Sequence, residues 1–157
     1  MKVIAVIPAR YKSTRFEGKP LVNLCGKPMI WWVHHQLCQV KGLSEIYVAT
    51  DDERIGKVCS DYGIKYVMTS DSHPTHLDRL AEFAENIESD FYININGDEP
   101  LMMPEYVERL LPTSDLNPAD FYFANAMTKI KKTVEVADIS RIKVVTDNLG
   151  YAMYMAR

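Results

Sequence analysis

Residues 45–68 read EIYVATDDERIGKVCSDYGIKYVM and contain the pattern that decides the fold. The stretch predicts a strand at 45–50, a helix from about 52 to 62 and a second strand at 64–68. Asp51 and Asp52 are suited to cap the start of the helix, and Gly63 is suited to end it. Strand, helix and strand in this order predict two parallel strands joined by a right-handed crossover.

The same alternation continues on both sides of this stretch. Further strands are expected at 2–7 and 90–95, and further helices from Lys27-Pro28, from Thr75 and over 104–111. These elements predict an α/β fold with a mostly parallel sheet and helices on both faces. From DFYFANAM (120–127) onward the pattern becomes strand-rich, and residues 148–150 are expected to form a hairpin turn.

Length and composition indicate one ordinary domain spanning residues 1–157. Hydrophobic residues make up 47% and charged residues 25%, and no apolar run is long enough to cross a bilayer. The apolar N-terminus is too short for a signal peptide, so a cytoplasmic protein is expected. The net charge of −3 gives no general attraction to nucleic acid, so no nucleic-acid partner is expected and any anion site must be local.

Three polar clusters follow expected strands: PARYKSTR after the first, TDD after the second and NGDEP after the fourth. Ligands of open parallel sheets bind outside the carboxyl ends of the strands. All three clusters are therefore expected at one edge of the sheet, and this edge is the candidate site.

The first cluster belongs to a basic loop that carries Arg10, Lys12, Arg15 and Lys19. The loop is no Walker A motif, because Lys19 is followed by Pro20, and the chain contains no G-x-G-x-x-G. Arginine forks and a lysine can still gather the oxygens of a phosphate chain. A solvated charged loop is the alternative, but so many like charges at a strand end favour a bound anion.

Asp98 in NGDEP is the candidate Mg²⁺ ligand, since magnesium takes one or two carboxylates when substrate phosphates supply the rest; Glu99 is the rival. For the TDD cluster, helix capping explains Asp52 without any ligand and is the favoured interpretation. A zinc site at His73 and His76 with the nearby acids is disfavoured, because the spacing is not one that zinc sites use.

Five stretches together resemble the 3-deoxy-manno-octulosonate cytidylyltransferases (CMP-Kdo synthetases): IPARYKSTRFEGKPL, NLCGKPMI, YVATDDERI, NINGDEP and IKVVTDNLGYAMYMAR. The resemblance implies a Rossmann-like nucleotidyltransferase fold, the substrate CTP and the cofactor Mg²⁺. It implies transfer of CMP to an acidic keto-sugar with release of pyrophosphate, for lipopolysaccharide or surface-sugar biosynthesis. The family's chains are longer, so the resemblance also implies that residues 1–157 are C-terminally incomplete. It further implies a homodimer for the full-length protein.

Carried over by position, the resemblance assigns roles to individual residues. Arg10 and Lys19 match residues that grip the CTP phosphates, with Arg15 adding positive charge, and Asp98 matches a magnesium ligand. The positions that line the nucleotide are Ala9, Asn96 and Gly97. Two departures stand out: Asn96 replaces the usual glutamine, and Thr75-His76-Leu77 replaces Ser-Gly-Thr beside the nucleotide and the sugar. Another acidic sugar, such as an amino-Kdo or a sialic-acid-like compound, and a non-catalytic nucleotide-binding fragment remain the alternatives.

Overall fold

The computed structural model describes residues 1–13, 16–113 and 122–156. They form two compact units, Met1–Tyr122 and Phe123–Arg157, each of which is described by itself. The expectation of a single domain over 1–157 stays a prediction. In the described part of the chain, no helix has the length and the apolar character that crossing a membrane requires.

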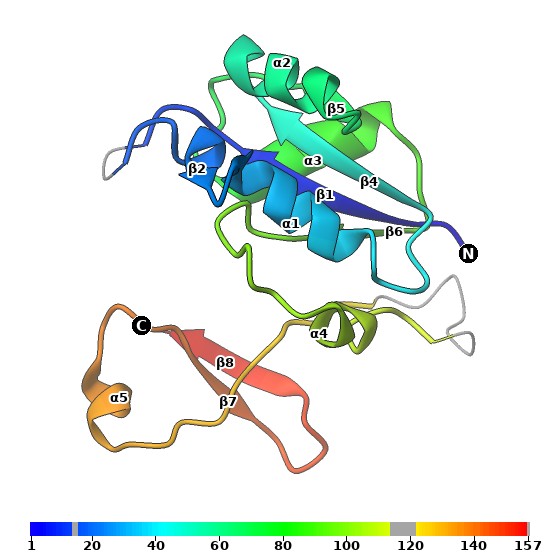
Figure 1. The fold of residues 1–157 in the computed structure, drawn as a ribbon. Helices are drawn as coiled ribbons and strands as arrows, with labels where there is room; N and C mark the ends of the chain where they lie inside the picture. Colours follow the sequence, from blue (N-terminus) through cyan, green and yellow to red (C-terminus); the bar gives the residue numbers. More distant parts are fainter. Residues whose placement is uncertain (14–15, 114–121, 157) are drawn as a thin grey trace. The chain divides into compact units, whose positions relative to one another are not determined.

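The first unit is built on a four-stranded sheet in the order β5-β4-β1-β6, and all its neighbouring strands are parallel (Figure 1). Its strands are β1 (Val3–Ala9), β4 (Glu45–Thr50), β5 (Tyr66–Met68) and β6 (Phe91–Asn94). The expected parallel sheet is therefore confirmed. The strand β4 has the expected bounds, whereas β5 begins two residues later than expected because the Ile64 amide donates to the carbonyl of Cys59 at the end of the preceding helix.

The central strand β1 continues through Pro8 to Ala9, beyond the expected end at residue 7. The carbonyl of Val6 accepts a hydrogen bond from the Ile95 amide, so alternate residues of β1 face β6. Pro8 lies on that side, past the last residue of β6. The N–H that proline lacks therefore costs the sheet no ladder bond.

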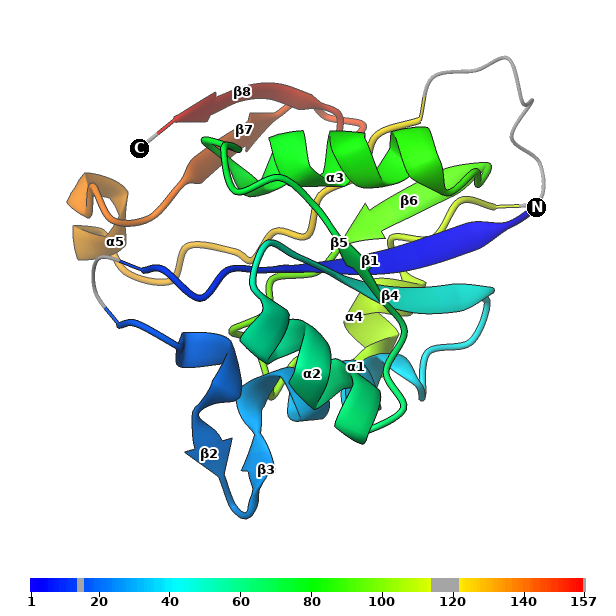
Figure 2. The same cartoon turned by 90° about the horizontal axis from the view of Figure 1, so that it is seen from above.

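Helices cover both faces of this sheet, as expected (Figure 2). The helices are α1 (Met29–Leu37), α2 (Glu53–Asp61), α3 (His76–Asn86) and α4 (Pro104–Glu108). One core lies between the sheet and α1, α2 and α4, with Ile30, Ile55 and Val107 as members. The second core lies under α3, where Phe83 packs on Ile4 and other residues of the opposite sheet face.

Short elements link β1 to α1. A 3-10 turn η1 (Lys19–Leu21) follows Gly18, which has a φ of 67°. The strands β2 (Asn23–Leu24) and β3 (Lys27–Pro28) then pair antiparallel. Lys19 therefore lies on an ordered turn, directly after a glycine in the left-handed conformation that other residues rarely adopt.

Local sequence explains where the helices α2 and α3 begin. Asp52 caps α2 by accepting from the Arg54 amide, and Gly63 beyond the end of α2 has a φ of 66°. Thr75 caps α3 through a reciprocal capping box with Asp78. The expected caps at Asp52 and Thr75 are thus confirmed.

The second unit contains α5 (Val134–Ala137) and an antiparallel hairpin of β7 (Lys143–Thr146) and β8 (Ala152–Ala156). The expected hairpin is confirmed, and its turn includes Gly150 with a φ of 90°. The pattern that is strand-rich from residue 120 onward forms no strand over the described residues 122–127. Residues 120–121 lie outside the described part. Apolar residues form a strand only with a partner for their backbone groups.

Candidate active site

A lysine and an aspartate that are 79 positions apart in sequence meet at the carboxyl edge of the sheet. Lys19 on η1 donates from Nζ to Oδ2 of Asp98, which follows β6, over 2.6 Å. Their side chains remain 38% and 48% exposed, so both can reach a ligand. The structure thereby joins the basic loop to the NGDEP cluster.

Gly97 makes this meeting possible. A Cβ atom at this position would lie 3.3 Å from the carbonyl oxygen of Pro8 and 3.4 Å from Cγ2 of Ile7. A side chain here would force the loop after β6 or the end of β1 to move by a few tenths of an ångström, so glycine favours this close approach. The predicted role of Gly97, lining the nucleotide, stays a prediction.

The two acids of NGDEP have different partners. Asn96 donates from Nδ2 to Oε1 of Glu99 over 3.1 Å, whereas Asp98 pairs with Lys19. The described part of the chain has no group of three or more His, Cys, Asp or Glu side chains that could hold a metal. The donor set at Asp98 nevertheless fits Mg²⁺, which commonly binds through one or two carboxylates and completes its shell with phosphate oxygens and water.

A pocket of about 340 Å³ opens beside the end of β1. Its walls are the end of β1 and the first residues of α3 with the loop before it: Pro8, Ala9, Arg10, His73, Pro74, Thr75, His76 and Arg79. The predicted residues Ala9 and Arg10 therefore line one cavity. Arg15 lies outside the described residues, so its predicted role stays a prediction.

The TDD cluster holds two arginines. Asp51 Oδ2 accepts from Nη2 of the buried Arg79 over 2.8 Å. Asp52 accepts from Nε and Nη2 of Arg54 over 2.8 and 2.7 Å, and this bidentate hydrogen bonding lowers the pKa of Asp52. Helix capping, the favoured interpretation of Asp52, is confirmed, and both carboxylates already have cationic partners.

His73 and His76 do not form a metal cluster among the described residues. His73 pairs through Nε2 with Glu82, and this contact is the largest cause of the lowered pKa of Glu82. Asp78 serves the α3 capping box. His73 and Asp78 therefore both have partners within the protein.

The family model described as "Cytidylyltransferase" matches residues 4–157. The chain belongs to this family. Among curated relatives, the 3-deoxy-manno-octulosonate cytidylyltransferase of Geotalea uraniireducens is 42% identical over 158 residues, and the alignment covers 100% of this chain and 62% of the relative. The 8-amino-3,8-dideoxy-manno-octulosonate cytidylyltransferase of Shewanella sp. is 41% identical over 160 residues, covering 100% and 65%.

A solved structure supports the cytidylyltransferase fold. It is a CMP:2-keto-3-deoxy-manno-octonic acid synthetase complexed with CTP, with a TM-score of 0.87 and 38% identity. The match covers 99% of this chain and 64% of that chain. The chain thus spans somewhat less than two thirds of the length of these cytidylyltransferases.

Sequence reasoning missed Arg54 and Arg79. Arg79 lies four positions before Phe83, so both occupy the inner face of α3, and Arg79 is only 4% exposed. An arginine on an apolar helical stripe, with an aspartate expected at the nearby strand end, was the signal that could have revealed the pair.

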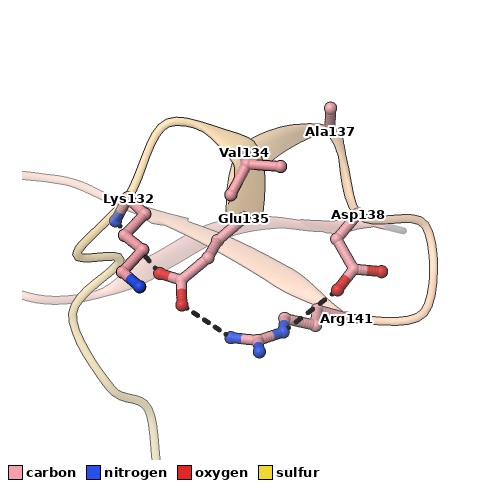
Figure 3. A pocket seen from close by; sticks show the side chains of 6 residues that line it. All are labelled: Lys132, Val134, Glu135, Ala137, Asp138 and Arg141. Carbon is pink, nitrogen blue, oxygen red and sulfur yellow. Dashed lines mark hydrogen bonds and ion pairs between the residues drawn. The ribbon is translucent and has the colours of Figure 1, made fainter.

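The second unit of the chain contains a pocket of about 410 Å³ (Figure 3). Its walls carry an ion-pair network in which Arg141 contacts Glu135 over 3.0 Å and Asp138 over 3.1 Å. Figure 3 shows the Arg141 guanidinium between these two carboxylates. None of the predicted site residues lines this pocket, and its charges largely satisfy one another.

Proposed function

We propose that this chain takes part in cytidylyl transfer from CTP to an acidic keto-sugar, 3-deoxy-manno-octulosonate, with release of pyrophosphate. The observation that carries the proposal is the Lys19–Asp98 pair at the carboxyl edge of the sheet, the same edge at which Arg10 lines a pocket. A lysine for phosphate and a carboxylate for magnesium stand together where parallel sheets bind ligands. The names of the curated relatives and of the CTP-bound structure supply the nucleotide and the sugar.

In the proposed arrangement, the nucleoside occupies the pocket and the triphosphate extends toward the basic loop. Arg10 lines the pocket, so its guanidinium is available to phosphate oxygens next to the ribose. Lys19 donates to the oxygens farther along the chain of phosphates. Bound magnesium would be held by Asp98 and would neutralise charge on the phosphate oxygens.

The reaction needs no covalent enzyme intermediate. The anomeric hydroxyl oxygen of the sugar forms a bond to the α-phosphorus while the bond to the leaving pyrophosphate breaks, and the hydroxyl proton is released. Arg10 and Lys19 stabilise the negative charge that the leaving group gains. The main contributions of the protein are therefore orientation and charge stabilisation.

Pyrophosphate release is the test of this function. The protein is incubated with CTP, Mg²⁺ and 3-deoxy-manno-octulosonate, with omission of each component as a control. We expect pyrophosphate and a CMP-sugar only in the complete mixture. Binding of the sugar and CTP without product from any acidic keto-sugar would contradict the proposal.

A second candidate keeps CTP but changes the sugar. The relative named for 8-amino-3,8-dideoxy-manno-octulosonate is 41% identical to this chain, close to the 42% of a relative named for the parent sugar. The same assay, run with both sugars and with a sialic acid, decides between them through the ratio of kcat/KM values.

A third candidate, of a different class, is nucleotide binding without transfer. The comparatively open Lys19–Asp98 pair can hold a triphosphate whether or not a sugar is oriented beside it. Tight CTP binding together with no turnover on the sugar panel would favour this candidate. A cytoplasmic location, self-association and the absence of a nucleic-acid partner are further parts of our proposal.

A further inference from the structure

The TDD cluster is the one strand-end cluster that the proposed function leaves without a role. Asp51 and Asp52 follow β4, and each holds a different arginine. Consecutive side chains at the end of a strand point to different sides, so one cluster can serve two neighbours. The two arginines lead to two different parts of the candidate site.

The contacts that start at Asp51, called the Asp51 branch below, extend to the pocket wall. Arg79 donates to Asp51 from Nη2 over 2.8 Å and to the Thr69 hydroxyl from Nη1. Thr69 follows β5 and its amide bonds to the carbonyl of Thr50 at the end of β4. Arg79 thereby fixes the first turns of α3 to two strand ends, and Arg79 itself lines the pocket.

The contacts that start at Asp52, called the Asp52 branch below, extend to the basic loop. Arg54, held by Asp52, stacks on the ring of Tyr11 with its guanidinium carbon 3.3 Å from the ring centroid. The Tyr11 carbonyl accepts from the Gly18 amide over 2.9 Å, and a Cβ at Gly18 would lie 3.0 Å from the tyrosine ring. Tyr11 thus closes the loop immediately before Lys19.

We propose that Asp51 and Asp52 are positioning residues for the two halves of the nucleotide site. Asp51, through Arg79, sets the wall of the nucleoside pocket. Asp52, through Arg54 and Tyr11, sets the loop that presents Lys19 to the phosphates. The inference rests on the proposed function, because it assigns the pocket to the nucleoside and the loop to the triphosphate.

Charge and burial favour this role over direct ligand contact. The Asp51–Arg79 side chains are 16% and 5% exposed, so a ligand would have to separate a buried pair to reach the carboxylate. Asp52 already accepts a bidentate arginine and a backbone amide. Asp51 and Asp52 are 16% and 17% exposed, against 48% for Asp98, so Asp98 is the carboxylate that is more open to a metal ion.

The two branches predict opposite selectivities, which calorimetric titration with cytidine and with inorganic pyrophosphate can measure. Asp51→Asn should weaken cytidine binding by roughly tenfold, the scale of one charge-assisted hydrogen bond, and change pyrophosphate binding by less than about twofold. Asp52→Asn should weaken pyrophosphate binding by roughly tenfold and change cytidine binding by less than about twofold. Asparagine remains a good helix cap, so this second change removes the charge but keeps the start of α2.

Two controls separate positioning from general stability. Glu53→Gln removes the next, exposed acid of the chain and should leave both affinities unchanged. The thermal midpoint and the binding stoichiometry show whether Asp51→Asn lowers the folded fraction. If it does, Arg79→Lys replaces it in the same comparison, because lysine keeps the positive charge but lacks the forked guanidinium group that binds Asp51 and Thr69. Arg54→Lys is the matched variant of the other branch.

Equal losses for cytidine and pyrophosphate in either branch, or no loss in both, would overturn the inference. A folded, unmodified protein that binds no CTP would contradict the proposed function itself. The unmodified chain therefore reports on the function, and the selectivity of the variants reports on the positioning.

Discussion

At the scale of single residues, the site depends on the contact between Lys19 and Asp98, which are 79 positions apart in the sequence. The residue types of Arg10, Lys19 and Asp98 indicated phosphate and magnesium chemistry, because they follow strands of a parallel sheet. The 2.6 Å pairing of Lys19 with Asp98 was not predictable, since it depends on the close approach of the loop after β6 to the end of β1 at Gly97. The role of Arg79 was missed because its burial requires Asp51 from another element.

Lys19→Ala should cost CTP more affinity than it costs cytidine, because the lysine is proposed to contact only phosphate. A loss of roughly tenfold or more for CTP is expected from a charge-assisted contact. Calorimetric titration with both ligands measures it. The exposed Lys57→Ala variant is the charge-matched control, and equal losses of CTP and cytidine for Lys19→Ala would mean that Lys19 only supports the loop.

Gly97→Ala should lower the free energy of unfolding by about 1–3 kcal/mol, the usual cost of overpacking. The new methyl group would meet the carbonyl oxygen of Pro8 at 3.3 Å, and this oxygen belongs to the central strand, which has little freedom to move. Urea denaturation without ligand measures the effect. An unchanged urea midpoint and slope would show that the loop after β6 can move away from β1 at little cost.

At the scale of elements, local signals decided which predictions held. The strand β4 has its expected bounds because four apolar residues, 46–49, lie directly before the polar TDD cluster. Both helix starts were predictable from capping residues whose partners are local. The strand-rich pattern from residue 120 onward gave strands only at the hairpin, since β pairing depends on a partner that the sequence pattern does not identify.

Thr75→Ala should destabilise the protein by about 1 kcal/mol, the typical value of a helix N-cap. The Thr75 hydroxyl accepts from the Asp78 amide, while the Asp78 carboxylate accepts from the Thr75 amide and hydroxyl. Thr75→Ser keeps the oxygen and should restore most of the loss. Urea denaturation of the pair of variants tests this, and equal stabilities would contradict a role of the capping box.

The opposite edge of the sheet should respond to acid through Glu45. Hydrogen bonds from Lys65, Tyr47 and Lys2 hold the pKa of Glu45 at about 2, below the value of an ordinary carboxyl group. A lowered pKa in the folded state stabilises the fold above the unfolded pKa, near 4.3, and this contribution is lost as the pH falls toward 2.

The corresponding experiment compares urea denaturation of the unmodified protein and Glu45→Gln at pH 7 and pH 3. The variant should be less stable at pH 7, and the difference should shrink at pH 3. The exposed Glu85→Gln variant serves as the control. A difference that stays constant between the two pH values would exclude Glu45 as the titrating group.

At the scale of the whole molecule, the first unit contains every described residue of the predicted site. The basic loop, TDD and NGDEP all lie at the carboxyl edge of its sheet, as the order of strands and helices predicted. The second unit was predictable only at its hairpin, where the turn residues are local. Its ion-pair pocket could not be foreseen, because surface charges pair according to tertiary placement.

The central claim is that this edge of the sheet holds the magnesium complex of CTP. Calorimetric titration of the protein with CTP, with and without Mg²⁺, and of the Asp98→Asn variant tests it most directly. We expect one CTP per chain, tighter binding with Mg²⁺, and loss of this magnesium effect in Asp98→Asn while the fold stays intact. Absence of CTP binding, or the same dependence on magnesium in both proteins, would contradict the account.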